Sequence, residues 1–312
     1  LDDYYRPYRQ YHTDPNLLAV RAAKPISAVW DDHEVANDSS STGAQNHQRT
    51  EGAYVDRVAA ATKAYFDWMP IRRPESNGPR VYRTLEWGDL ARIILLDTRI
   101  IGRVRQLNYQ RALGLHLLSD GAGTQAAIEE FRSTQLLDPA RTLLGAEQEA
   151  WLAETLASSK QRGQTWQILA QQIVVGEQLV GAGAAALVSP ETHANVRRYV
   201  TVGERLGRMG MPWNLDSWDG YPAARERFLQ ACAASAANAV VLGGDSHNTW
   251  LNNLMAPGDA ARRAAIEFAG ASVTSPGLEQ ARSAGAAGAR EAMMRSANAQ
   301  LAWCDVTHRG YG

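Results

Sequence analysis

Three short apolar runs in this sequence each lead directly into a cluster of charged and polar residues. Apolar runs of about four to eight residues, bounded by turn-forming residues, are typical of buried strands. In α/β proteins, side chains that act together gather at the carboxyl ends of the strands. We therefore expect the three clusters to converge at one edge of a sheet. The runs are residues 25–30, 91–96 and 239–242, and the clusters that follow them are residues 31–34, 97–99 and 245–247.

The rest of the sequence alternates between strand-like and helix-like patterns. A hairpin is indicated by two strand-like runs, residues 81–87 and 90–96, on either side of Gly88-Asp89. Alternation of strands with amphipathic helices predicts an α/β domain built in layers. Further strands are expected at residues 165–168, 173–175, 264–268 and 301–306, and helices at residues 54–69, 147–156, 223–236 and 281–299.

Length and composition favour a single globular domain over residues 1–312. Hydrophobic residues make up 45% of the chain and charged residues 21%, as is ordinary for a soluble globular protein. Two long segments lack clear periodicity and are expected to be insertions or cap loops, residues 102–142 and 176–220. We expect the protein to be a monomer.

The charge pattern excludes several classes of partner. A formal net charge of −1 gives no electrostatic basis for binding nucleic acid or an anionic membrane. No apolar run approaches the roughly 20 residues that a membrane helix requires. Cys232 and Cys304 are expected to be buried thiols, and a disulfide between them stays open as an alternative. We therefore expect neither a nucleic-acid-binding surface nor a membrane segment.

The cluster Asp31-Asp32-His33-Glu34 indicates a metal site. Hard cations prefer carboxylate oxygens, and an imidazole adds a second type of ligand. A cation also relieves the repulsion within a dense acidic cluster. The alternative is a solvated acidic turn, but the apolar run before the cluster and Asn37 after it favour the metal site.

Residues 243–247 (GGDSH) have the same design. In an extended segment, Asp245 and His247 point the same way and can bind a common cation. The preceding glycines allow backbone or ligand to approach closely. A strand-end turn with a surface histidine is the alternative, and the presence of two such clusters in one chain favours the site.

Arg99 ends the third cluster, Asp97-Thr98-Arg99. Its guanidinium is a rigid fork of donors that fits phosphate oxygens. A structural ion pair between Arg99 and Asp97 is the alternative explanation.

These motifs resemble the signatures of the PhoD-like alkaline phosphatases and phosphodiesterases, a family of the calcineurin-like metallophosphoesterase superfamily. Residues 30–35 (WDDHEV) match the W-D-D-H-E-V signature. The other matches follow in family order along nearly the whole chain. They are L-D-T-R at 96–99, L-G-x-x-Q-x-x-W-L at 144–152, D-x-W-D-G-Y-x-x-x-R at 216–225, G-D-x-H-x-x-W at 244–250, S-x-T-S-P-G at 272–277 and H-R-G-Y at 308–311.

The resemblance implies a fold, an activity and a location. The implied fold has two facing mixed β-sheets flanked by helices, an α/β/β/α sandwich. The implied activity is hydrolysis of phosphomonoesters and phosphodiesters by a metal-activated oxygen nucleophile, with iron and calcium as cofactors. The substrate would be a phosphoester small molecule or a phosphopolymer. The full-length protein would be secreted, periplasmic or on the cell surface.

The resemblance also assigns roles to six residues of this sequence. His33 and Arg99 would be catalytic and would contact the phosphoryl group of the substrate. The positions assigned to metals are Asp32, Asn37, Asp245 and His247.

One part of the family pattern has no counterpart here. Members begin with G-S-C and G-D-x-x-Y segments that supply a cysteine, a bridging aspartate and a tyrosine to the metals, and nothing before Trp30 matches them. We therefore expect further ligands upstream of Leu1, a chain cut at both ends, an incomplete first sheet, and weak catalysis by these 312 residues alone. Two alternatives stay open: a non-catalytic relative that binds phosphate or phosphorylated polymers, and a metal hydrolase of another ester class.

Overall fold

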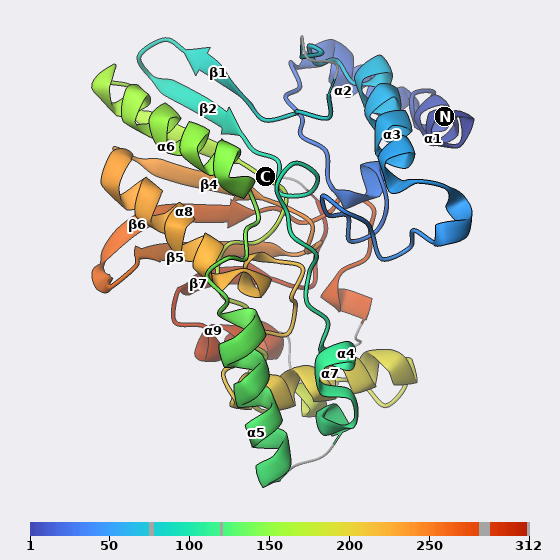
Figure 1. Cartoon of the computed structure of the whole chain (residues 1–312), viewed down its shortest axis with the longest axis vertical. Helices are drawn as coiled ribbons and strands as arrows, with labels where there is room; N and C mark the ends of the chain where they lie inside the picture. The colour runs from blue at the N-terminus through green and yellow to red at the C-terminus, as the bar shows by residue number, and fades with distance from the viewer. Residues whose placement is uncertain (75–77, 119–120, 281–287, 311–312) are drawn as a thin grey trace.

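A seven-stranded mixed sheet organises the computed structural model, which describes residues 1–74, 78–118, 121–280 and 288–310. The strand order is β1-β2-β3-β4-β6-β5-β7 (Figure 1). Strands β2, β3, β4 and β6 run parallel, whereas β1, β5 and β7 are antiparallel to their neighbours. The strands are β1 (Arg83–Trp87), β2 (Ala91–Leu95), β3 (Trp166–Ala170), β4 (Ala239–Gly243), β5 (Thr249–Ala256), β6 (Asp259–Ala269) and β7 (Leu301–Asp305).

The connections explain the strand directions. β1 and β2 form the expected hairpin through a turn at Gly88, whose φ of 57° favours glycine. A parallel pair instead needs a long crossover connection, usually a helix. α6 (Gly145–Gln161) connects β2 with β3, and α8 (Pro222–Ser235) connects β3 with β4. The helices expected at residues 147–156 and 223–236 are thereby confirmed.

One face of the sheet is covered by helices. α6 and α8 pack on it, and Leu156 of α6 and Phe228 of α8 belong to the same buried core as the strand residues beneath them. α9 (Ala289–Ala297) covers this face near β5 and β7, where Met294 shares a core with Trp250. Burial of these aliphatic and aromatic side chains is the main stabilising contribution to the layered fold.

The opposite face carries large apolar side chains that solvent reaches, and we call it the open apolar face. Leu242 pairs with Phe268, Phe268 with Leu251, and Leu251 with Trp303, so these side chains form a row across four strands. Phe268 and Trp303 are 49% and 47% exposed. The most exposed large side chains of this face are Leu85, Trp87, Trp166, Leu242, Phe268 and Trp303.

Three helices near the start of the chain form a layer beside the sheet, coloured blue in Figure 1. Buried Trp30 contacts Tyr65 at a centroid distance of 5.5 Å, and both share a core with Val35. This core fixes the segment that follows Trp30, including the short 3₁₀ helix η1 (Asp32–Glu34). The three helices are α1 (Asp2–Tyr11), α2 (Pro15–Ala23) and α3 (Tyr54–Trp68), and a second 3₁₀ turn is η2 (Arg49–Glu51).

The two segments expected as irregular insertions fold into helices that pack on each other, and we call α4, α5 and α7 the helical cap. Ile128 and Phe131 of α5 share a buried core with Leu206 of α7. Figure 1 shows this cap below the sheet. The helices in these segments are α4 (Tyr109–Leu113), η3 (Gly114–Leu118), α5 (Ala122–Phe131), the π-helical η4 (Arg132–Leu136), η5 (Ala184–Leu187), α7 (Ala194–Arg208) and η6 (Trp218–Gly220).

Two expected strands are not strands in the structure. Residues 25–30 pair with no strand among the described residues, and the carbonyl of Ala28 instead accepts a hydrogen bond from the Arg83 side chain at 2.9 Å. Residues 173–175 are buried, but the amide of Val175 donates to the side-chain carboxylate of Glu267 on β6 at 2.6 Å rather than to the backbone of a strand. Residues 173–175 are apolar because they are buried, whereas in residues 25–30 only Trp30 is buried and the other side chains are half-buried or exposed.

The expected α/β class is confirmed. All seven strands lie in one sheet, and the second facing sheet of the implied sandwich is not found in the part of the chain that the structure describes. Cys232 and Cys304 are free and buried, as expected. The helix expected at residues 281–299 is α9, and residues 281–287 lie outside the described residues, as does Tyr311 of the H-R-G-Y match. Within the described ranges, no helix is long and apolar enough to cross a membrane.

Candidate active site

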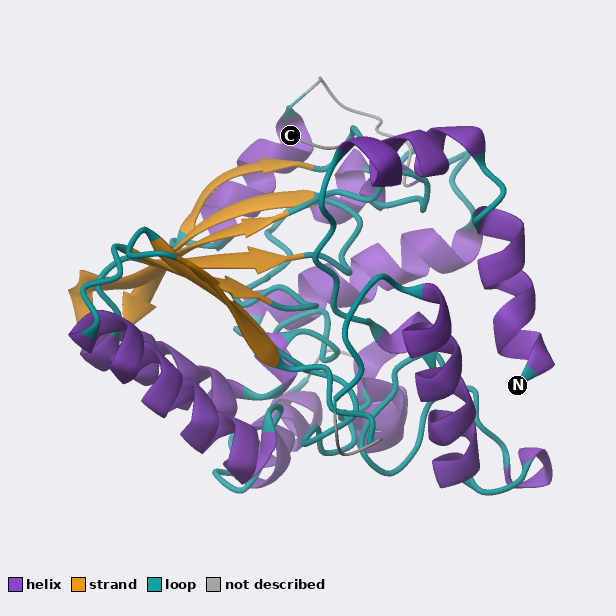
Figure 2. Cartoon of the chain, turned by 90° about the horizontal axis from the view of Figure 1, so that it is seen from above, coloured by secondary structure: helices purple, strands orange, loops and turns teal. Residues whose placement is uncertain are grey.

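The three polar clusters converge beyond the carboxyl ends of β2 and β4. Figure 2 shows the arrowheads of the parallel strands pointing into a region rich in loops. Asp31 and Asp32 reach this region from η1, Arg99 follows β2, and Asp245 follows β4. One carboxylate oxygen from each of Asp31, Asp32 and Asp245 lies within 4.8 Å of the others. The convergence expected from the sequence is therefore present.

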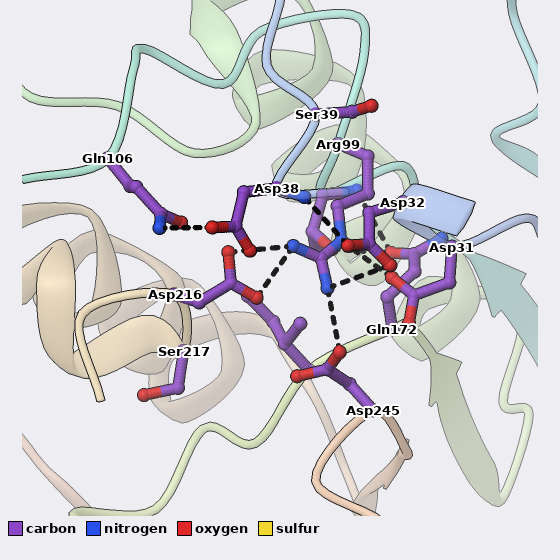
Figure 3. A network of polar contacts seen from close by, with 12 residues as sticks. Asp31, Asp32, Asp38, Ser39, Arg99, Gln106, Gln172, Asp216, Ser217 and Asp245 are labelled. Atoms are coloured by element: carbon purple, nitrogen blue, oxygen red, sulfur yellow. Dashed lines mark hydrogen bonds and ion pairs between the residues drawn. The ribbon is translucent and has the colours of Figure 1, made fainter. Parts of the chain in front are cut away.

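Arg99 lies at the centre of this cluster and is completely buried (Figure 3). Its Nε donates to Asp31 at 2.5 Å, its Nη1 donates to both carboxylate oxygens of Asp216 at 2.7 and 2.9 Å, and its Nη2 donates to Asp245 at 3.0 Å. The carboxylate of Asp32 is 3.9 Å from Nη2. One guanidinium therefore holds four carboxylates from three distant parts of the chain together.

Asp216 and Arg103 are part of the site although the sequence reasoning did not assign them a role. Asp216 lies just before η6 and accepts hydrogen bonds from both Arg99 and Arg103. Arg103 also donates to the main-chain carbonyl of Asp216 at 3.0 Å. The D-x-W-D-G-Y match contained Asp216 and was the signal that could have identified it.

The turn that carries Arg99 is fixed by buried hydrogen bonds to its neighbours. The carboxylate of Asp97 accepts from the amides of Arg99 and Ile100, at 2.7 and 2.9 Å. The side chain of Gln148 accepts from the amide of Asp97 and donates to its carbonyl, both at 2.8 Å. Gln172 accepts from the amide and hydroxyl of Thr98. Asp97 therefore shapes the turn and forms no side-chain ion pair with Arg99 there.

Unusual backbone conformations concentrate at the site. Asp38, Asp245 and His247 have φ values of 53°, 61° and 59°, and they are the non-glycine residues with positive φ in the described chain. Such conformations cost energy and persist where the surrounding structure enforces them. At Asp38, this conformation is held by a hydrogen bond from its backbone amide to the Asp32 carboxylate at 2.8 Å.

The electrostatics of the cluster favour an additional cation. Five carboxylates face two guanidinium groups here, which leaves a formal excess of negative charge when all the acids are ionised; the carboxylates are Asp31, Asp32, Asp38, Asp216 and Asp245. Burial raises the pKa of Asp245 well above its usual range; Arg99 lowers it, but the neighbouring carboxylates raise it again. Burial also opposes ionisation of Asp216, but Arg103 and Arg99 lower its pKa.

His247 follows Asp245 by two residues but lies outside the group of three convergent carboxylates that is found among the described residues. Its Nδ1 is 2.8 Å from the carbonyl oxygen of Pro276. Since a carbonyl only accepts, this contact places a proton on Nδ1 and leaves Nε2 as the free acceptor. A histidine that ligates a metal usually has this arrangement.

The side chains of two other predicted residues form no hydrogen bond with the described residues of the cluster, although the amide of His33 donates to the Asp32 carboxylate at 2.9 Å. Asn37 donates to the side chain of Gln45 at 2.5 Å. His33 is exposed and lines a separate cavity of about 300 Å³ with residues of α1, including Tyr8. Their roles as a calcium ligand and a catalytic group stay predictions, as does a contact between Arg99 and the phosphate.

Comparisons with known proteins place the chain in a family. The family model of the PhoD-like phosphatases matches residues 1–312. This chain belongs to the PhoD-like phosphatase family. Alkaline phosphatase D of Bacillus subtilis (strain 168) is 35% identical over 283 residues, which cover 89% of this chain and 40% of that protein. A solved structure of PhoD matches with a TM-score of 0.68 and 30% identity, covering 98% of this chain and 51% of the other. The chain thus spans about half or less of the length of these relatives.

The side chains of this PhoD-like chain fit a metal ion. Asp31, Asp32 and Asp245 supply hard carboxylate oxygens at close range. His247 lies two residues after Asp245, and since Pro276 holds its Nδ1, Nε2 is the nitrogen that remains for a ligand. Asp31 is an addition to the predicted metal positions. Its backbone amide is held by Glu34 at 2.6 Å, so η1 presents both aspartates toward the cluster.

Proposed function

We propose that this chain carries the catalytic region of a metal-dependent phosphoester hydrolase that acts on phosphomonoesters and phosphodiesters. The observation that carries the proposal is the convergence of Asp31, Asp32 and Asp245 within 4.8 Å, in a chain that belongs to the PhoD-like phosphatases. The proposed substrates are small phosphoesters or phosphopolymers. We also propose a secreted, periplasmic or cell-surface location, which rests on the family resemblance alone.

The proposed metal ligands are Asp31, Asp32, Asp245 and His247, with Asn37 as a further ligand. The proposed metals are iron and calcium, as the family resemblance implies. Bound cations would supply Lewis-acid charge beside the phosphoryl group. The carboxylate oxygens and Nε2 of His247 are the groups of this chain that suit such ions.

The protein contributes a site that is held in place before substrate arrives. Arg99 keeps the carboxylates of Asp31, Asp216 and Asp245 together by direct hydrogen bonds. Its positive charge favours their ionised form, which is the form that binds cations. In this proposal Arg99 and His33 also neutralise charge on the phosphoryl and leaving-group oxygens.

Hydrolysis of p-nitrophenyl phosphate and bis(p-nitrophenyl) phosphate by the purified protein tests the proposal. Asp245→Asn and His247→Ala are expected to lower kcat by about 100-fold or more and to lower the bound metal measured by mass spectrometry. Asp89→Asn, at an exposed hairpin turn, is the matched control and keeps wild-type activity. Wild-type turnover in His247→Ala, or in protein stripped by a chelator, contradicts the assignment.

A further inference from the structure

A cavity of about 550 Å³ opens next to the carboxylate cluster. Two of its lining residues, Asp38 and Asp216, belong to that cluster, and the rest of its wall comes mainly from the segments that form the helical cap. Its volume lies in the range of cavities that hold small organic ligands. The cavity is therefore within reach of a group attached to a phosphate bound at the cluster.

The cavity wall combines aromatic rings with an exposed cationic side chain. Tyr199 of α7 is 52% exposed and lies 5.2 Å from Trp213, measured between ring centroids. Arg198, next to Tyr199, is exposed and forms no hydrogen bond or ion pair with the part of the chain that the structure describes.

Other side chains hold this wall in place. Tyr109 of α4 donates from its hydroxyl to the carbonyl of Pro212 at 2.6 Å, which ties α4 to the segment that leads to Trp213. Gln106 donates to the carboxylate of Asp38 at 2.9 Å, at the boundary between cavity and cluster (Figure 3). The cavity is thus built by contacts between the two cap segments rather than by a single loose loop.

We propose that this cavity is the subsite for the organic group of the substrate, and that it selects a nucleoside, a planar aromatic ring with hydrogen-bonding edges. This inference rests on the proposed phosphoester hydrolysis. Tyr199 offers a half-exposed ring for stacking, and Arg198 offers a planar cation with hydrogen-bond donors. An alkyl chain would leave the guanidinium of Arg198 without an acceptor, and a glycerol would leave the ring face of Tyr199 without a stacking partner.

The test compares two phosphomonoesters with the same reacting group, adenosine 5′-monophosphate and glycerol 3-phosphate. The wild-type protein is expected to prefer the nucleotide in kcat/KM. Tyr199→Ala is expected to lower the ratio of the two kcat/KM values by about tenfold, since stacking of a base on an aromatic side chain is of that strength. Tyr199→Phe keeps the ring and is expected to keep the preference.

Trp87→Ala is the matched control, because it removes a 66% exposed aromatic ring on β1, outside the residues that line the cavity. It is expected to change neither kcat/KM value. An equal fall for both substrates in Tyr199→Ala, or no preference for the nucleotide in the wild type, overturns the proposal.

Calorimetric titration with adenosine, which carries no phosphate, separates this inference from the proposed function. Binding of adenosine that Tyr199→Ala weakens and Tyr199→Phe retains supports the subsite, whether or not the protein hydrolyses either ester. Absence of adenosine binding to a protein that does hydrolyse both esters leaves the proposed function standing and overturns the nucleoside subsite.

Discussion

Arg99→Met tests whether one guanidinium compensates the charge of the carboxylate cluster. Arg99 is completely buried and makes four hydrogen bonds of 3.0 Å or less to Asp31, Asp216 and Asp245. Removing one partner of a buried ion pair typically costs ~3–5 kcal/mol, because the remaining charge stays buried and uncompensated. Methionine fills a similar volume, so lost packing contributes little. We expect the free energy of unfolding at pH 8 to fall by ~3–5 kcal/mol.

The assay is urea unfolding of wild type and variant in the presence of a chelator, then with added calcium. A cation that binds only the folded state stabilises it by mass action, by ~2.7 kcal/mol at a concentration of about 100 times Kd. Added calcium is therefore expected to restore part of the free energy of unfolding that Arg99→Met loses.

Arg6→Met is the matched control, because Arg6 pairs with Asp3 at 2.7 Å, the Arg99–Asp216 distance, but both side chains are more than three-quarters exposed. Its unfolding curve is expected to match the wild type. A loss below ~1 kcal/mol in Arg99→Met would refute the role of Arg99 as the central counter-charge.

Three further predictions concern buried groups outside the carboxylate cluster. Gln148→Leu removes the hydrogen-bond partners of the amide and carbonyl of Asp97. Urea unfolding is expected to show that the free energy of unfolding falls by ~2–4 kcal/mol. A change near zero contradicts the role of Gln148 in stabilising the turn that carries Arg99. Burial raises the pKa of Asp219 from 3.8 to about 6, although Arg225 lowers it. Between pH 4 and 6 the folded wild type therefore holds a proton that the unfolded chain has released, so wild-type stability falls as pH rises through this window. Asp219→Asn lacks this dependence of stability on pH. Thermal unfolding at pH 4.5 and 6.5 is therefore expected to show that the stability difference between wild type and Asp219→Asn shrinks as pH rises. A difference that grows contradicts the raised pKa of Asp219. Burial raises the pKa of Cys232 to about 12, so intact-mass analysis is expected to show no iodoacetamide labelling of this thiol at pH 8 until denaturant is added; rapid labelling of the folded protein contradicts its burial.

The sequence predicted the strands that hold the site because each has a strong local signal. The runs that became β2 and β4 are short and apolar and end on a polar cluster. Residues 25–30 show the same pattern without pairing, because an apolar run does not by itself determine hydrogen-bond partners. Within this run only Trp30 is buried, and it packs against Tyr65 of α3.

Helix α7 was not predicted because its glycines resemble those of a loop. Gly207 is required by a close approach: a Cβ atom there would lie 2.0 Å from the carbonyl oxygen of Val180. Gly203 also faces Val180, at 3.1 Å from its side chain. Glycine is a poor helix former, so a prediction based on helix propensity misses a helix whose glycines are needed for close packing.

The membership of the site was only partly predictable. Asp245 follows an apolar strand and was identified by its motif, whereas Asp216 follows an irregular segment and lies 117 residues from Arg99. No local pattern reports a contact over that distance. The same limit applies to the cavity beside the cluster, since Tyr109 and Tyr199 meet there only through the packing of the cap.

The open apolar face has a consequence for how these 312 residues behave in solution. Rows of tryptophan, phenylalanine and leucine on a sheet attract similar surfaces and hydrophobic dyes. That attraction strengthens in sulfate and phosphate salts, which are excluded from protein surfaces. Preparations at low concentrations of such salts should stay dispersed, whereas salting-out conditions should bring copies together sheet to sheet and increase dye fluorescence.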